Sequence, residues 1–144
     1  GMGPGKYDLM GEVLEKMGVK ILYRSLEVRP GRATIFGVRD QTLFFSLPGP
    51  PPAVHLLFNE LVRPAIFALQ GNRSAPQKVR AVLEDEIVIP KKGVLNLKSG
   101  ITAVRSGIFY VRPTGLTEAA TATILIPGNR RLLRAGEKVS VHLH

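Results

Sequence analysis

The stretch from Leu47 to Gly71 constrains the fold more than any other part of the chain. It begins with a Pro-Gly turn and continues with apolar residues at the 3.6-residue period of one helix face, namely Val54, Leu57, Phe58, Leu61, Val62, Ala65, Ile66 and Leu69. Proline suits the first turn of a helix, because its missing N–H would have no intrahelical partner there. Pro64 lies inside the pattern. We therefore expect a kink near Glu60 or a local gap in the hydrogen-bond ladder.

The start of this helix predicts an anion site. The first N–H groups of a helix have no partners within it, and the positive end of the helix dipole lies there. Pro48 and Gly49 determine what this end faces. An ordinary strand-to-helix connection is the alternative interpretation, because a short motif is only a hypothesis about a site.

The residues before this helix predict a small α/β layer. Residues 7–17 place apolar side chains on one helix face, and Gly18 is a typical residue to end a helix. Residues 19–24, 33–38 and 42–47 are rich in β-branched and aromatic residues and predict strands. A unit of about 70 residues is small for an independent core, so we expect it to form part of a larger assembly.

The periodicity changes after residues 73–77, which are polar with a proline and predict a linker. Short candidate strands then follow at 78–83, 86–89, 94–97, 101–105, 107–112, 120–126, 131–133 and 139–143, with Gly and Pro turn signals between them. Strands of this length and spacing predict a compact barrel or sandwich. The predicted fold class is therefore α/β plus all-β, with a partial α/β layer in residues 1–72 and a small β-barrel in residues 78–144.

Composition excludes several classes of protein. The chain contains no cysteine, which rules out disulfides, thiolate metal ligands and a cysteine nucleophile and fits a reducing compartment. No apolar run approaches the ~20 residues of a membrane span. These features predict a cytoplasmic protein with no membrane partner. The three histidines, His55, His142 and His144, are too dispersed in the sequence to predict a metal site.

The formal net charge of +9 predicts an anionic partner or a soluble basic protein. The excess of basic residues is larger in the second half of the chain, so a β-barrel that binds nucleic acid is one alternative. Base stacking on that barrel could use only Phe109 and Tyr110. Nucleic acid is therefore the less favoured partner.

Several short segments together resemble the molybdopterin molybdenumtransferase family, which includes MoeA and the E domain of gephyrin. They are KYDL at 6–9, RPGR at 29–32, LPGPP at 47–51, LVRP at 61–64, RPTG at 112–115 and AGEKV at 135–139. No single segment is specific, but their order follows the family along nearly the whole chain. The resemblance implies a remnant of MoeA domain III followed by a barrel similar to domain IV.

This resemblance also implies a function in molybdenum cofactor biosynthesis, in which molybdate is inserted into adenylylated molybdopterin and AMP is released. It implies molybdopterin, molybdate and Mg²⁺ as ligands, with Asp8 as a catalytic acid and magnesium ligand. The implied substrate- and anion-binding residues lie in the two Pro-Gly turns: Arg29, Pro30, Gly31, Arg32, Pro48, Gly49 and Pro51. The partners implied are an anionic pterin nucleotide and other molybdenum cofactor proteins. An incomplete α/β layer also leaves apolar surface uncovered, which predicts a homodimer.

Departures from the family pattern favour reduced catalysis. Pro50 replaces an Asn of the family turn and removes a side-chain amide together with a backbone N–H. Ala53 replaces a Ser and Ser46 replaces a Gly. The family's N-terminal domains have no counterpart here, so we expect the chain to hold at most half of a catalytic pocket. A pterin- or anion-binding or assembly module without turnover is therefore the main alternative.

Overall fold

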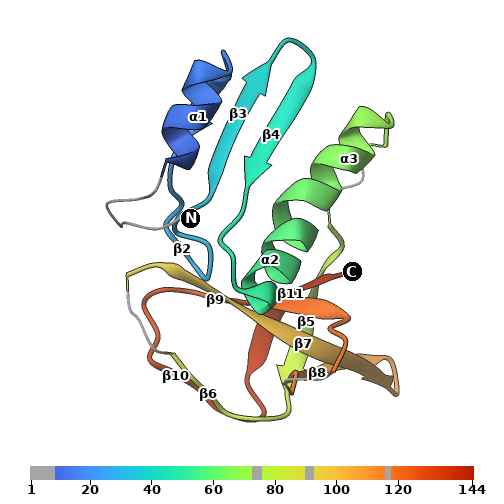
Figure 1. The fold of residues 1–144 in the computed structure, drawn as a ribbon. Helices are drawn as coiled ribbons and strands as arrows, with labels where there is room; N and C mark the ends of the chain where they lie inside the picture. Colours follow the sequence, from blue (N-terminus) through green and yellow to red (C-terminus); the bar gives the residue numbers. More distant parts are fainter. Residues whose placement is uncertain (1–8, 73–75, 90–92, 116–117) are drawn as a thin grey trace. The chain divides into compact units, whose positions relative to one another are not determined.

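The computed structural model describes residues 9–72, 76–89, 93–115 and 118–144 (Figure 1). Its contacts divide the chain into two compact units, Gly1–Phe58 and Asn59–His144. The predicted linker at 73–77 stays a prediction, because residues 73–75 lie outside the described part of the chain, and the division between the units falls within the long helix. None of the described helices is both long and apolar enough to cross a membrane.

The first unit combines helices with a three-stranded antiparallel sheet in the order β1-β3-β4. Its elements are α1 (Met10–Lys16), β1 (Lys20–Tyr23), β2 (Val28–Arg29), β3 (Ile35–Arg39), β4 (Thr42–Ser46) and α2 (Pro51–Leu57). Gly18 follows α1 with a φ of +75°, and its N–H donates to the carbonyl of Glu15, as a glycine that ends a helix does. The partial α/β layer expected from the sequence is confirmed in kind.

The sheet of this unit has two different faces. Leu14, Val19 and Ile35 form a small buried core on one face, with Ile21 and Phe44 packed against it. Aromatic rings gather on the other face, where Phe36 lies 5.6 Å from Tyr23 and 4.6 Å from Phe45 between ring centroids. Phe36 and Phe45 are direct cross-strand partners, an arrangement that stabilises antiparallel pairs.

Helical residues run from Pro51 to Leu69 but change type in the middle. A π-helical segment, η1 (Phe58–Val62), separates α2 from α3 (Arg63–Leu69). Pro64 has no N–H to donate to the carbonyl of Glu60, and a single π turn accommodates such a gap. The expected lapse in the ladder before Pro64 is thus confirmed.

The second unit contains a closed β-barrel, seen in the lower part of Figure 1. Its strands are β5 (Lys78–Leu83), β6 (Ile87–Val88), β7 (Leu95–Arg105), β8 (Ile108–Pro113), β9 (Ala122–Ile126), β10 (Leu132–Leu133) and β11 (Lys138–Leu143). Neighbouring strands follow the order β7-β8-β5-β11-β9, and β9 pairs with β7 again to close the ring. All these pairs are antiparallel except β5 and β8, which are parallel. The predicted barrel is confirmed.

One detail of the strand prediction is wrong. The sequence predicted separate strands at 94–97 and 101–105, but β7 runs through Gly100 without a break. A Cβ on Gly100 would lie 2.8 Å from Cγ2 of Val111 and 3.0 Å from Cγ1 of Ile124, both in the barrel core. This glycine therefore permits close packing across the barrel and does not mark a turn.

Candidate functional site

The turn of residues 29–32 is fixed against helix α2 by one glycine. Gly31 is buried and has a φ of +126°, a conformation that side chains disfavour. A Cβ at this position would lie 2.6 Å from Cδ2 of Leu57, so the turn and α2 touch because the side chain is missing. The Gly31 carbonyl accepts hydrogen bonds from the N–H and hydroxyl of Thr34 at 3.0 and 2.7 Å. The Arg29–Pro30 peptide bond is cis.

The two arginines of this turn have no acidic partner in the described residues. Arg29 and Arg32 are both exposed, and no ion pair or side-chain hydrogen bond within the described ranges involves either guanidinium. Carboxylates do pair with other arginines in the same ranges, namely Arg24, Arg39, Arg105, Arg112 and Arg130. Neither guanidinium of this turn therefore has an ion-pair partner among the described residues.

The start of helix α2 differs from what the sequence analysis expected. Pro50 is the N-cap, and Pro51 and Pro52 are the first two helical residues, so none of the three has an N–H. The N–H groups of Ala53 and Val54 both donate to the Pro50 carbonyl, at 2.9 and 3.1 Å. The prediction of several unpaired N–H groups at this helix start is therefore wrong, because consecutive prolines remove the donors.

The start of α2 still carries the positive end of the helix dipole. No acidic residue lies in the first turn of α2, so the helix dipole is not neutralised there by a side chain. Between Pro48 and Ala53 only Gly49 carries a backbone N–H. The backbone at this end can thus offer few hydrogen bonds to an anion.

Asp8, the expected catalytic acid and magnesium ligand, lies outside the described residues. Among the residues that the structure describes, no group of three or more acidic or histidine side chains could hold a metal ion. The described residues therefore do not form a magnesium site, and no step through Mg²⁺ is derived from them.

Two segments that carry the family resemblance hold loops of the barrel together. The Arg112 guanidinium donates to both carboxylate oxygens of Glu118 at 2.8 and 2.6 Å, and the N–H of Gly115 donates to the same carboxylate at 2.7 Å. Glu137 likewise accepts from Arg130 and from the backbone N–H of Arg134. Within the described residues, Glu118 and Glu137 therefore stabilise loops of the barrel.

Glu118 should titrate far below an ordinary glutamate. Its hydrogen bonds from Arg112 and from the Gly115 N–H lower its pKa to about 2. Because the folded-state pKa is depressed, the stabilisation is complete above the ordinary pKa of 4.5 and is lost as the pH falls through about 2. NMR titration of the Glu118 carboxyl should give this midpoint, and Arg112→Ala should move the midpoint towards 4.5. An unchanged midpoint in the variant would show that Arg112 is not the cause.

Sequence reasoning missed a partly buried carboxylate–histidine pair in the second unit. The Glu60 side chain is only 10% exposed, and its Oε2 lies 2.7 Å from Nδ1 of His142. Nε2 of His144 lies 4.0 Å from the other oxygen, Oε1, and hydrogen-bonds Thr123 at 2.8 Å. Glu60 and His142 are 82 positions apart, so no local pattern could have paired them.

Fold and site together define a class. An α/β unit with a turn packed on a proline-started helix, followed by a closed barrel, is the arrangement that the sequence resemblance to the MoeA family implied. Residues 1–68 match the family model described as "Probable molybdopterin binding domain".

Two similar proteins carry names from the same family. The chain is 30% identical over 152 residues to a molybdopterin molybdenumtransferase of Staphylococcus epidermidis and 24% identical to one of Staphylococcus aureus. Each alignment covers 99% of this chain but only 36% of the relative. The chain is thus related to the molybdopterin molybdenumtransferases and spans about a third of their length.

Solved structures show the same fold. A molybdopterin biosynthesis MoeA protein from Pyrococcus horikoshii matches with a TM-score of 0.75 and 24% identity, covering 94% of this chain and 34% of that one. A molybdenum cofactor biosynthesis protein from Pyrococcus furiosus matches with a TM-score of 0.68 and 28% identity, covering 99% and 56%. The resemblance inferred from the short segments is confirmed.

Proposed function

We propose that this chain binds the anionic part of a molybdopterin nucleotide at the Arg29–Arg32 turn, as part of molybdate insertion into adenylylated molybdopterin. One observation carries the proposal: Gly31 lets the turn pack on Leu57 of the helix that follows Pro48 and Gly49. Two of the segments shared with the family are thereby held by the same helix. The family relationship supplies the class of ligand.

The chemistry at this turn suits phosphate or molybdate. Guanidinium groups donate two parallel hydrogen bonds to an oxyanion, and Arg29 and Arg32 have no competing carboxylate in the described ranges. The residues proposed to contact the anion are Arg29, Pro30, Gly31, Arg32, Pro48, Gly49 and Pro51, with Asp8 as the proposed acid and Mg²⁺ ligand.

Binding without turnover is the second candidate, and the helix start favours it. Pro50, Pro51 and Pro52 leave no backbone donors where a transferring oxyanion would need them. Under this alternative the chain still binds the ligand but releases no AMP. A search for AMP release from adenylylated molybdopterin and molybdate distinguishes the two candidates.

Arg29→Ala should weaken molybdate and AMP binding by tenfold or more. One charge-assisted contact contributes on the order of 1.5–3 kcal/mol when partly desolvated, and about 1.4 kcal/mol equals a factor of ten. Isothermal titration calorimetry with each ligand measures the change. Because Arg29 is exposed, the variant should keep the fold.

The matched control is Arg131→Ala. Arg131 is also exposed and has no ion pair among the described residues, whereas Arg130 is bound to Glu137 and would disturb a loop. Both variants remove one positive charge from the chain. Equal losses of affinity would mean that the attraction is diffuse charge and that the turn is not a site.

We further propose that the chain forms a homodimer through the first unit. Helix α1 and the residues on either side of it expose apolar side chains, with Leu9 54%, Val13 44% and Met17 46% exposed. Sedimentation equilibrium at tens of micromolar, roughly the range in which a weak interface registers, should detect a dimer. Val13→Glu should give monomers, while Val104→Glu, at a site in β7 that is 58% exposed, should leave the dimer intact. A monomeric parent chain would refute the proposal.

A further inference from the structure

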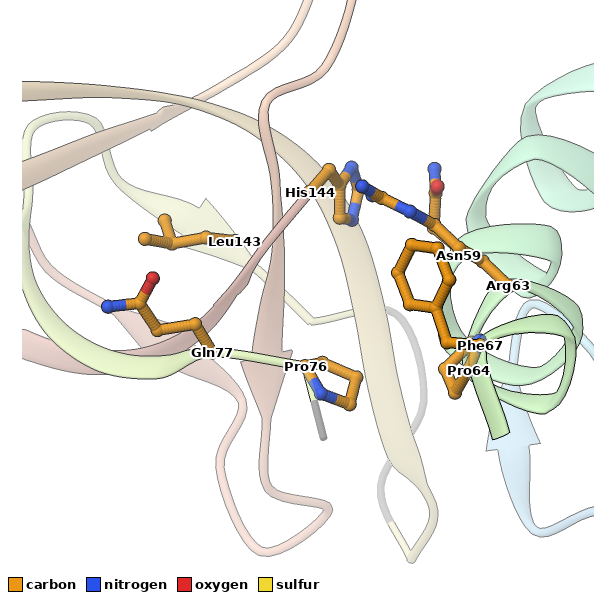
Figure 2. A pocket seen from close by; sticks show the side chains of 8 residues that line it. All are labelled: Asn59, Arg63, Pro64, Phe67, Pro76, Gln77, Leu143 and His144. Atoms are coloured by element: carbon orange, nitrogen blue, oxygen red, sulfur yellow. The ribbon is translucent and has the colours of Figure 1, made fainter. Parts of the chain in front are cut away.

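The second unit contains a pocket that shares no residue with the proposed anion site. It has a volume of about 210 Å³ and lies between the helix residues Asn59, Arg63 and Phe67, the segment before β5, and the end of β11 at Leu143 and His144. Figure 2 shows the Arg63 side chain extending from the helix towards His144, with the Phe67 ring below it. The pocket therefore combines a cation and an imidazole with an aromatic wall.

Arg63 is a cation without a carboxylate in the described residues. Its guanidinium lies 5.4 Å from the centroid of the Phe67 ring, and no described ion pair includes it. On a regular helix Glu60, three residues earlier, would be its natural partner. Here Glu60 lies in the π-helical segment, and its carboxylate binds His142 at 2.7 Å.

The pairing of Glu60 has an electrostatic consequence for the pocket. The Glu60 carboxylate is buried against His142 and is not among the groups that line the cavity. Arg63 thus has no ion-pair partner among the described residues, and its side chain is half-buried. The Glu60 carboxylate does approach the pocket lining, since its Oε1 lies 4.0 Å from Nε2 of His144. A half-buried cation over an aromatic ring favours an anionic group that brings apolar surface with it.

We propose that this pocket binds a small aromatic carboxylate, with the carboxylate on Arg63 and the ring against Phe67, Pro76 and Leu143. The size agrees, because a cavity of about 150 Å³ accepts benzene and the larger volume here leaves room for a charged substituent. The guanidinium supplies two parallel donors to the carboxylate. The site shares no residue with the Arg29–Arg32 turn, so it stands or falls independently of the proposed function.

Benzoate is the probe, and amide NMR titration of the whole chain is the measurement. Benzoate should shift the amide signals of Asn59, Phe67, Leu143 and His144, and these shifts should saturate. Benzamide has the same shape without the charge and should bind about tenfold more weakly, since it loses the charge-assisted contact. This comparison uses the parent chain and does not depend on the folding of any variant.

Substitutions then locate the contact. Arg63→Leu should weaken benzoate binding about tenfold or more while leaving benzamide binding nearly unchanged, and Arg63→Lys should retain part of the affinity. Arg131→Ala, which removes the same charge outside the pocket, should change neither. The proposal is overturned if benzoate gives no saturating shifts at the pocket, if benzamide binds equally well, or if Arg131→Ala weakens benzoate as much as Arg63→Leu does.

Discussion

Gly31→Ala is expected to lower the free energy of unfolding of the first unit by about 2–6 kcal/mol, since a strained φ and overpacking of a core each cost about 1–3 kcal/mol. A φ of +126° disfavours any side chain, and the added methyl would lie 2.6 Å from Cδ2 of Leu57. Leu57 is only 1% exposed and has little room to move. Urea unfolding followed by the amide NMR signals of residues 9–58 measures the loss.

A second substitution separates the two causes. In Gly31→Ala/Leu57→Ala the clash with Leu57 disappears but the φ strain remains, so the cost of adding the methyl at residue 31 should be smaller in a Leu57→Ala background than in the parent chain. Gly49→Ala is the matched control, because a Cβ at Gly49 would meet nothing within 4 Å. If Gly31→Ala is no more destabilising than Gly49→Ala, the turn is not held against α2 as described.

His142→Leu is expected to destabilise the second unit by about 2–4 kcal/mol, because removing one partner of a buried pair leaves a carboxylate without its donor. Glu60 is 10% exposed, and its Oε1 has no hydrogen bond within the described residues. Its Oε2 would lose the 2.7 Å contact with His142. Chemical unfolding monitored by the amide signals of the barrel strands measures the change.

Replacing both partners should restore stability. In Glu60→Leu/His142→Leu neither polar partner remains, and apolar residues in place of such a pair are often as stable as the pair that they replace. The double variant should therefore be more stable than His142→Leu alone. If instead the double variant is the less stable of the two, Glu60 stabilises the helix by contacts other than the one with His142.

Local patterns were sufficient to find most of the elements. The alternation of Lys78–Leu83 predicted β5 with its observed bounds, and Gly18 was correctly placed after the first helix. Pro64 predicted the irregularity that appears as η1. These features depend on neighbours within a few residues, and such information is present in the sequence itself.

The lack of free amides at the start of α2 also follows from the sequence. Pro50, Pro51 and Pro52 have no N–H in any conformation. A count of donors would have shown that this helix begins without free amides. The proposed anion site therefore depends more on Arg29 and Arg32 than on backbone amides.

The amino-acid sequence alone predicted most of the helix and strand segments, the change from α/β to all-β and the resemblance to the molybdopterin molybdenumtransferases, because each follows from periodicity or from short ordered motifs. Tertiary structure alone decided which side chains meet. Gly31 lies on Leu57, Gly100 lies under Val111, and Glu60 binds His142 across 82 positions. Such contacts depend on how closely the packed elements approach one another, and a pattern of neighbouring residues in the sequence does not predict that distance.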